Sequence, residues 1–469
     1  MMKDNKNLLI IISLFCIILF KRLLFLNIGI NYEESRDLSS IIKVANGDVL
    51  YRDFEFSHGF LGVYFNALIF KVLGVTNIII PRLIVSIFFA VSSIFAYKIA
   101  LRFLSPFWAF VAVLLGFSGL VTREHVYGHI FAFFGIMVAL WAGLSYIYDE
   151  KIRNLGYSGM ASGIALISKP LPLGILSAFT LVCLLVYKHF FTGHSKGLQP
   201  YLIFAFSLLL FPIMGISYFF WNNAFWVFLE STFLPMFTAQ GPHPSHFFFL
   251  PSIIPDDLFA ANSLSELKTI LNIYIYKNLR WWLISVFFVT GTGYSIFKLY
   301  KNKRDKHYLS ILFLSAFSIV FEIQRILIHG LNPYVSLFPT FVLLIYFGVK
   351  INRFYFAKLL VKIMIFFLFI LYFVYTPVIY YINYEKDGVP LGLKPASNVI
   401  VMPFTREVYQ EATVFINNNT GEEDKIVVAD YNLLFHIFSN RKNLFSKNYL
   451  IFFRTTFHPI KNSFSLSVE

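Results

Sequence analysis

Long apolar runs dominate the chain, and they recur at the length needed to cross a lipid bilayer. The pattern predicts about eleven membrane-spanning helices. They cover residues 8–29, 80–100, 106–122, 127–147, 157–168, 171–188, 201–220, 281–299, 307–324, 333–350 and 357–381. A further apolar stretch, 60–73, is too short to span and predicts an interfacial or re-entrant helix.

Composition agrees with this pattern. Of the 469 residues, 58% are hydrophobic and 14% are charged, whereas soluble proteins carry about 25% charged residues. The two cysteines, Cys16 and Cys183, fall in predicted spans, so no disulfide framework is implied. We therefore expect an α-helical polytopic membrane protein.

Basic residues predict how the chain is oriented, because short cytoplasmic loops carry an excess of lysine and arginine. Such residues gather on the side of the N-terminus, which is therefore predicted to be cytoplasmic. They are Lys3, Lys6, Lys98, Arg102, Lys151, Arg153, Lys188, Lys196, Lys298, Lys301, Lys303, Arg304, Lys306, Lys350, Arg353 and Lys358. The loops 30–79 and 221–280 and the C-terminal tail then lie outside. The net charge of +14 is explained by this topology and by anionic lipid, which argues against nucleic-acid binding.

The sequence divides into two predicted units. Residues 1–382 form the membrane domain, and residues 383–469 form a small external domain. In the tail, apolar residues at helical spacing predict a helix over 405–416 and a short helix over 431–438. Apolar runs at 425–429 and 449–453 predict strands, so the tail is expected to be a small α/β element.

An acidic cluster follows the first predicted span. Glu33 and Glu34 lie at the start of an expected helix, with Asp37 one turn further on. Asn31 and Glu34 have the spacing of a capping box, which would give the acids a structural role. The alternative is a general base that removes the proton of an acceptor hydroxyl. The two interpretations are compatible, because a capped helix can also present a base.

Other polar residues are expected at the same outer surface. Arg123 and Glu124 precede the fourth span and predict either a hydrated turn or a group that orients an acceptor. Arg52, Lys169, Arg325 and His329 are cations on the side that the positive-inside rule disfavours. They could extend to the lipid surface individually, or together bind an anionic lipid phosphate.

Motifs that the sequence lacks restrict the class of donor substrate. The sequence contains no glycine-rich phosphate loop, and its predicted cytoplasmic loops are short. A nucleotide-linked donor is therefore not expected, and any activated donor is expected to be carried by the membrane.

These motifs resemble the integral-membrane GT-C glycosyltransferases of the protein O-mannosyltransferase and aminoarabinose lipid A transferase type (family 39-like). Glu33–Glu34 stand where those enzymes carry an Asp-Glu pair, counted back from Asn46-Gly47, Tyr51-Arg52-Asp53 and His58-Gly59. The resemblance extends to Arg123-Glu124-His125, to Ser168-Lys169-Pro170, and to Arg325 ahead of Asn332-Pro333-Tyr334. In the tail it includes Asp424-Lys425-Ile426-Val427 and Ser439-Asn440-Arg441-Lys442.

The resemblance implies transfer of a sugar from a polyprenyl-phosphate donor to a hydroxyl of a lipid, glycan or protein, with inversion at the sugar. Glu33 or Glu34 would be the base, and Glu124 would help to orient the acceptor. Arg52, Lys169 and Arg325 would hold the phosphate, and the other residues expected to line the substrate site are Asp53, His58, Arg123, His329 and Tyr334.

The resemblance requires no cofactor. A divalent metal stays open, although no ligand spacing argues for one. The location that it implies is a bacterial inner membrane.

Two alternatives remain at this stage. One is a transporter or flippase of lipid-linked glycans, and the other is a non-catalytic membrane subunit of an envelope-glycan assembly. A transporter predicts polar residues distributed through the middle of the membrane, whereas the predicted spans are nearly free of them. That distribution favours chemistry at the membrane surface.

Overall fold

The computed structural model describes residues 2–30, 32–54, 58–118, 127–192, 197–238, 288–327, 334–350 and 386–421, with short pieces elsewhere in the tail. The helices of the membrane part are α1 (Met2–Leu23), α2 (Tyr32–Ala45), α3 (Leu61–Leu73), α4 (Ile79–Ala100), α5 (Pro106–Ser118), α6 (Tyr127–Asp149), α7 (Ile152–Ser168), α8 (Ile175–Thr192), α9 (Gln199–Trp221), α10 (Phe225–Thr238), α12 (Lys306–Leu327) and α13 (Tyr334–Lys350). A further helical stretch covers residues 288–301.

Each predicted span that is described overlaps a helix, but the first one was drawn too long: α1 ends at Leu23, and residues 24–29 of the predicted span 8–29 form a turn and a β-bridge. Three of these helices, α4, α6 and α9, are long and apolar enough to cross a membrane by length and composition. Span 357–381 lies almost wholly outside the described residues. The predicted number of about eleven spans therefore stays a prediction, while the predominantly helical architecture is confirmed.

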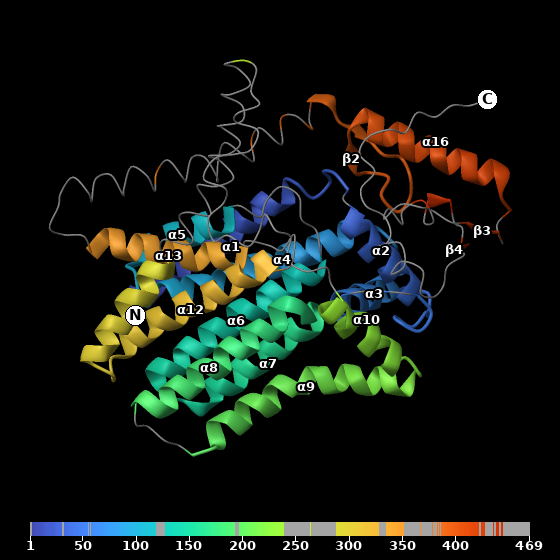
Figure 1. Ribbon diagram of the computed structural model, residues 1–469. Coiled ribbons are helices and arrows are strands. Elements are labelled where there is room, and N and C mark those ends of the chain that lie inside the picture. Colours follow the sequence, from blue (N-terminus) through green and yellow to red (C-terminus); the bar gives the residue numbers. More distant parts are fainter. Residues whose placement is uncertain are drawn as a thin grey trace.

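The bundle is centred on α6, which is buried along most of its length and packs between α4 and α7 (Figure 1). Helix α7 in turn packs against α9 through small residues. A Cβ atom added at Gly159 would lie 2.5 Å from the Phe204 carbonyl oxygen, and one at Gly163 would lie 2.5 Å from that of Leu208. The GxxxG spacing of these two glycines lets the backbones approach closely, as is common between membrane helices.

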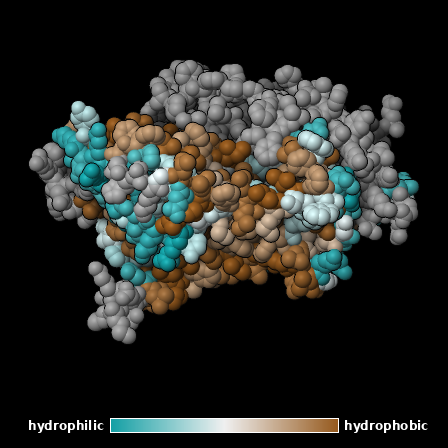
Figure 2. Space-filling model, turned by 90° about the horizontal axis from the view of Figure 1, so that it is seen from below, coloured by the Kyte–Doolittle hydropathy of each residue, from teal (hydrophilic) through white to brown (hydrophobic). Residues whose placement is uncertain are grey.

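The surface of the bundle carries an apolar band. Figure 2 shows hydrophobic residues across the middle of the visible face, with hydrophilic residues gathered toward its two ends. Helix α9 contributes exposed Phe206, Ile213 and Met214 to the apolar surface. A band of this kind suits contact with lipid tails, because no polar group there has to be removed from water.

The short helices α2 and α3 pack against each other at one end of the bundle (Figure 1). Helix α2 begins at Tyr32, as the acidic cluster predicts, and α3 occupies the predicted interfacial stretch 60–73. Gly74 ends α3 with a left-handed backbone conformation (φ 65°), which is the usual way for a glycine to terminate a helix.

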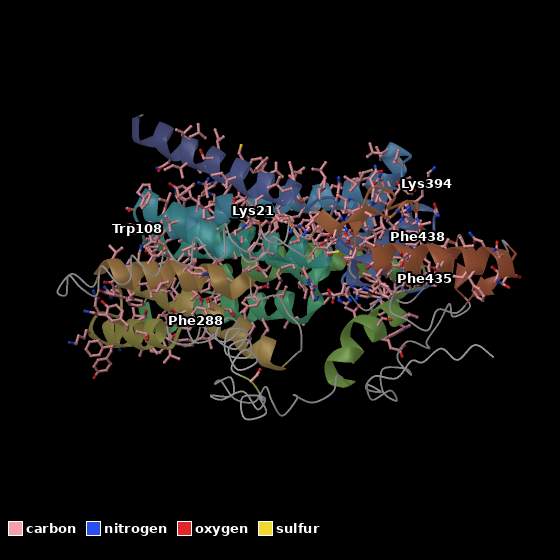
Figure 3. All side chains as sticks on the ribbon, turned by 90° about the horizontal axis from the view of Figure 1, so that it is seen from above. Lys21, Trp108, Phe288, Lys394, Phe435 and Phe438 are labelled. Atoms are coloured by element: carbon pink, nitrogen blue, oxygen red, sulfur yellow. The ribbon has the colours of Figure 1, made fainter. Side chains whose placement is uncertain are left out.

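The described part of the tail contains helix α16 (Pro403–Asn419), which covers the predicted helix over 405–416. Tyr409 on its buried side contacts the rings of Phe435 and Phe438, at centroid distances of 5.2 and 5.5 Å (Figure 3). Strand β3 (Lys425–Ile426) lies at the predicted strand and pairs in parallel with β4 (Lys442–Asn443). The predicted strand over 449–453 lies outside the described residues.

Candidate functional site

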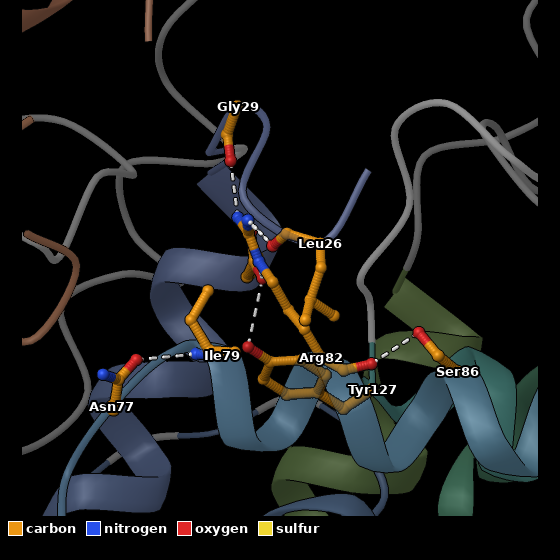
Figure 4. Close-up of polar contacts among 8 residues, drawn as sticks. Leu26, Gly29, Asn77, Ile79, Arg82, Ser86 and Tyr127 are labelled. Carbon is orange, nitrogen blue, oxygen red and sulfur yellow. Dashed lines mark hydrogen bonds and ion pairs between the residues drawn. The ribbon is translucent and has the colours of Figure 1, made fainter. Parts of the chain in front are cut away.

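A buried ion pair joins the acidic cluster to the N-terminal end of α4. Arg82 donates from Nε to Oε1 of Glu34 at 2.6 Å, and from Nη2 to Oε2 at 2.7 Å (Figure 4). The side chains are 0% and 1% exposed respectively. The planar guanidinium matches the carboxylate in this two-pronged geometry, so the pair fixes orientation as well as distance.

Arg82 also holds the connection between α1 and α2. Its Nη1 donates to the Leu26 carbonyl at 2.7 Å, and its Nη2 donates to the Gly29 carbonyl. The hydroxyl of Tyr127, at the start of α6, donates to Glu34 Oε1 at 3.1 Å. One arginine therefore links α1, α2 and α4, and Glu34 extends the same network to α6.

A second cluster lies further along α2. The Asp37 carboxylate accepts from Arg36 at 2.9 and 3.2 Å, and the charges of Glu33 and Lys169 both act on it. Burial raises the pKa of Asp37 above its ordinary value, and the positive charges of Arg36 and Lys169 oppose that rise. Glu33 is only partly buried, in contrast to Glu34 and Asp37.

Lys169, whose charge acts on Asp37, directly follows the last residue of α7. Its backbone leaves the helical conformation (φ −148°, ψ 87°), and Pro170, which cannot continue the helix, starts a π-helical turn over Pro170–Gly174. Lys169 is only 7% exposed. A lysine at a helix C-terminus is favoured by the helix dipole, and here it also brings a positive charge toward the acids of α2.

The loop between α2 and α3 packs against the same helix ends. A Cβ atom at Gly59 would collide with the carbonyl groups of Ile167 and Ser168, so only glycine fits there. The ring of His58 lies 6.4 Å from that of His129 on α6. This loop and the end of α7 are therefore direct neighbours, although they are more than 100 positions apart in the sequence.

Arg52 is turned toward its neighbour in sequence. It donates to Asp53 from Nε at 2.8 Å and from Nη2 at 2.9 Å, and its side chain is 41% exposed. Asp53 also accepts from the Val49 amide at 2.7 Å. The charge of Arg52 is therefore balanced within the loop in this structure.

The structure does not place every predicted residue. Arg123, Glu124 and His329 lie outside the described residues, and of Arg325 and Tyr334 only the helical backbone is described. The described residues contain no group of three or more histidine, cysteine, aspartate or glutamate side chains able to hold a metal.

Sequence reasoning assigned no role to Arg82 or Tyr127. Arg82 carried a usable signal, because it is a cation at the predicted outer end of an apolar helix, where the positive-inside rule disfavours it. Tyr127 carried no such signal, since tyrosine is common at membrane interfaces. Its role depends on contact with Glu34, which is 93 positions away.

Comparison with known proteins identifies the fold. No protein-family model and no curated protein sequence matches the chain. Among solved structures, ArnT from Cupriavidus metallidurans, bound to undecaprenyl phosphate, is similar at 12% identity, over 93% of this chain and 85% of that one, with a TM-score of 0.53.

The oligosaccharyltransferase AglB from Archaeoglobus fulgidus, in complex with an inhibitory peptide and a dolichol-phosphate, is similar at 13% identity with a TM-score of 0.47. The match covers all of this chain but only 62% of AglB. Both relatives are GT-C glycosyltransferases. The similarity to ArnT and the apolar helices together show an integral membrane protein with the fold of the GT-C glycosyltransferases.

Proposed function

We propose that the chain is a glycosyltransferase that moves a sugar from a polyprenyl-phosphate donor to an acceptor hydroxyl at the outer face of the membrane. The observation that carries the proposal is the packing of the α2–α3 loop, at Gly59, against the carbonyl of Ser168, which directly precedes Lys169, together with the favourable charge interaction between Lys169 and Asp37. This arrangement brings a positive charge, suited to a phosphate, close to carboxylates suited to accept a proton. The fold shared with ArnT, which was solved with undecaprenyl phosphate, supports a lipid-linked donor.

We assign the role of general base to Glu33 rather than Glu34. Both oxygens of Glu34 already accept hydrogen bonds, and the side chain is 1% exposed, so an acceptor hydroxyl has no approach to it. Glu33 is partly exposed on the same helical turn. A base has to come within hydrogen-bond reach of the proton that it removes, and Glu33 meets that condition better.

Lys169 is proposed to bind the phosphate of the donor. Its position beside α2 would place the leaving group near the base, on the other side of the sugar carbon that is attacked. The acceptor oxygen would form its bond to that carbon as the bond to the phosphate oxygen breaks. The acceptor proton would go to Glu33, and Lys169 would offset the charge that develops on the phosphate. This single displacement inverts the configuration of the sugar.

Sugar transfer in membrane vesicles tests the assignment. Wild-type protein, Glu33→Gln and Glu34→Gln are compared with a mixture of radiolabelled polyprenyl-phosphate sugars, and binding of undecaprenyl phosphate is measured in parallel. Glu407→Gln, an exposed glutamate on α16, serves as the matched control. We expect Glu33→Gln to lower transfer by about 10²–10⁴-fold, the usual contribution of a general base, with lipid binding retained.

Each other outcome has a defined meaning. Unchanged transfer by Glu33→Gln would exclude Glu33 as the base. Loss of transfer in Glu34→Gln alone, with normal stability, would return the role to Glu34. Movement of labelled lipid between leaflets without transfer would replace the glycosyltransferase by a flippase.

A further inference from the structure

The C-terminal segment is bonded directly to the connection between α1 and α2. Strands β1 (Val389–Pro390) and β2 (Ile400–Val401) form an antiparallel hairpin. The Ile400 amide donates to the Asn27 carbonyl at 2.6 Å, and the Gly29 amide donates to the Ile400 carbonyl at 2.8 Å. The connection thus pairs with the edge of this hairpin through a single parallel β-bridge between Ile28 and Ile400.

The register of the hairpin leaves Ile400 available for this pairing. Ile400 lies opposite Pro390, which has no amide proton to donate. The neighbouring bond between the strands runs from the Leu391 amide to the Val399 carbonyl at 2.9 Å. In an antiparallel pair, hydrogen-bonded positions alternate with positions whose amide and carbonyl face the other way. Both main-chain groups of Ile400 therefore face Asn27 and Gly29.

The contact continues from Gly29 to the acidic cluster. The Gly29 carbonyl accepts from Arg82, which is paired with Glu34, and Glu33 is the adjacent residue on the same helix. Gly29 has a φ of 67°, a left-handed conformation that suits glycine. The Gly29 amide donates to Ile400, and the Gly29 carbonyl accepts from Arg82. A displacement of Ile400 would therefore also displace Arg82.

The hairpin also touches the start of α4. The Ile78 amide, immediately before that helix, donates to the Pro395 carbonyl at 3.3 Å. Leu391, Ala396 and Val399 are almost fully buried where the hairpin packs on the bundle. The hairpin therefore holds both segments that Arg82 joins, namely the connection after α1 and the first turn of α4.

We propose that the main chain of Ile400 is a positioning element for the acidic cluster, acting through Gly29 and Arg82 to hold the first turn of α2, with Glu33 and Glu34, in its working position. The effect on transfer rests on the proposed function, whereas the effect on the mobility of α2 does not. Displacement of a reacting group by about 1 Å can cost 10²-fold in rate, so a modest loosening has a measurable effect.

Proline substitution tests the proposal, because it removes one main-chain donor. Ile400→Pro loses the bond to Asn27 and keeps the bond from Leu391 to Val399. Ile400→Val keeps the amide and changes only the side chain. Met402→Pro is the matched control, since Met402 already has proline-like angles (φ −65°, ψ 147°) and precedes Pro403.

Hydrogen exchange of the amides of α2, in detergent micelles, is the first measurement. We expect Ile400→Pro to raise exchange in residues 33–45 at least tenfold and to leave α6 and α7 unchanged. In the wild type, the amides of Gly29 and Ile400 should exchange in the same opening event as the amides of α2, with the same free energy of opening. Unaltered exchange of α2 in a folded Ile400→Pro protein, or independent opening in the wild type, would overturn the proposal.

The second measurement is the rate of sugar transfer divided by the amount of bound undecaprenyl phosphate. This normalisation excludes misfolded protein, which does not bind the lipid. We expect a fall of kcat of at least tenfold for Ile400→Pro, a KM for donor within twofold, and wild-type values for Ile400→Val and Met402→Pro. Faster exchange with unchanged kcat would refute the positioning role. Absence of transfer in the wild type would refute the proposed function and leave the exchange result to decide the structural part.

Discussion

Removal of Arg82 is the most direct test of how the end of the bundle that carries α2 and the start of α4 is held. Arg82→Met keeps most of the side-chain volume but leaves Glu34 charged, buried and without its guanidinium. Breaking a buried ion pair by deleting one partner costs about 3–5 kcal/mol, because the remaining charge is not compensated. The carbonyl groups of Leu26 and Gly29 lose their donors as well, so the loss should lie at the upper end of this range.

The double variant separates the charge from the packing. Arg82→Met combined with Glu34→Gln leaves no buried charge, so it should recover about 1–3 kcal/mol of the loss. Unfolding by sodium dodecyl sulfate in mixed micelles, followed by fluorescence of the six tryptophans, gives the free energies. If Arg82→Met costs less than about 1 kcal/mol, or if the two single effects simply add, the ion pair does not organise this region.

Four further predictions test other parts of the structure. Gly159→Leu should separate α7 from α9 and abolish a monodisperse peak on size-exclusion chromatography, because its Cβ has no room; an intact peak would contradict the close packing. Asp37→Asn should gain stability relative to wild type as the pH rises above 3.8. The wild-type carboxyl has a raised pKa in the folded state, so losing its proton costs more free energy in the folded protein than in the unfolded chain. Denaturation between pH 4 and 7 measures this difference, and a constant value would show that the burial has no effect. Lys169→Gln should weaken binding of undecaprenyl phosphate about 10–100-fold, the range for a charge-assisted hydrogen bond. The partly exposed Arg52 should tolerate replacement by alanine without loss of stability.

Much of the helical framework could be predicted from the sequence, because apolar runs of spanning length have few alternative structures. Helices α4, α6 and α9 lie where the hydrophobic pattern places them. The start of α2 was also predicted, since acids in a first turn are a local signal.

The partners of the acids could not be predicted in the same way. Glu34 and Arg82 are 48 positions apart, and the sequence left Glu33 and Glu34 equivalent as candidates for the base. Only the three-dimensional contact shows that one glutamate is enclosed and its neighbour is not. The hairpin β1–β2 was missed for a related reason: strands of two residues are too short for a periodic pattern to appear.

The bonds of Gly29 have a consequence for the order in which the protein is made. The connection between α1 and α2 leaves the ribosome early, but its carbonyl groups and Glu34 gain their donor only when α4 has been synthesised. The Ile400 amide and carbonyl arrive after nearly the whole chain has been inserted. The hydrogen bonds around Gly29 are therefore completed late, and a nascent chain that stops short of the hairpin lacks the final support of its acidic cluster.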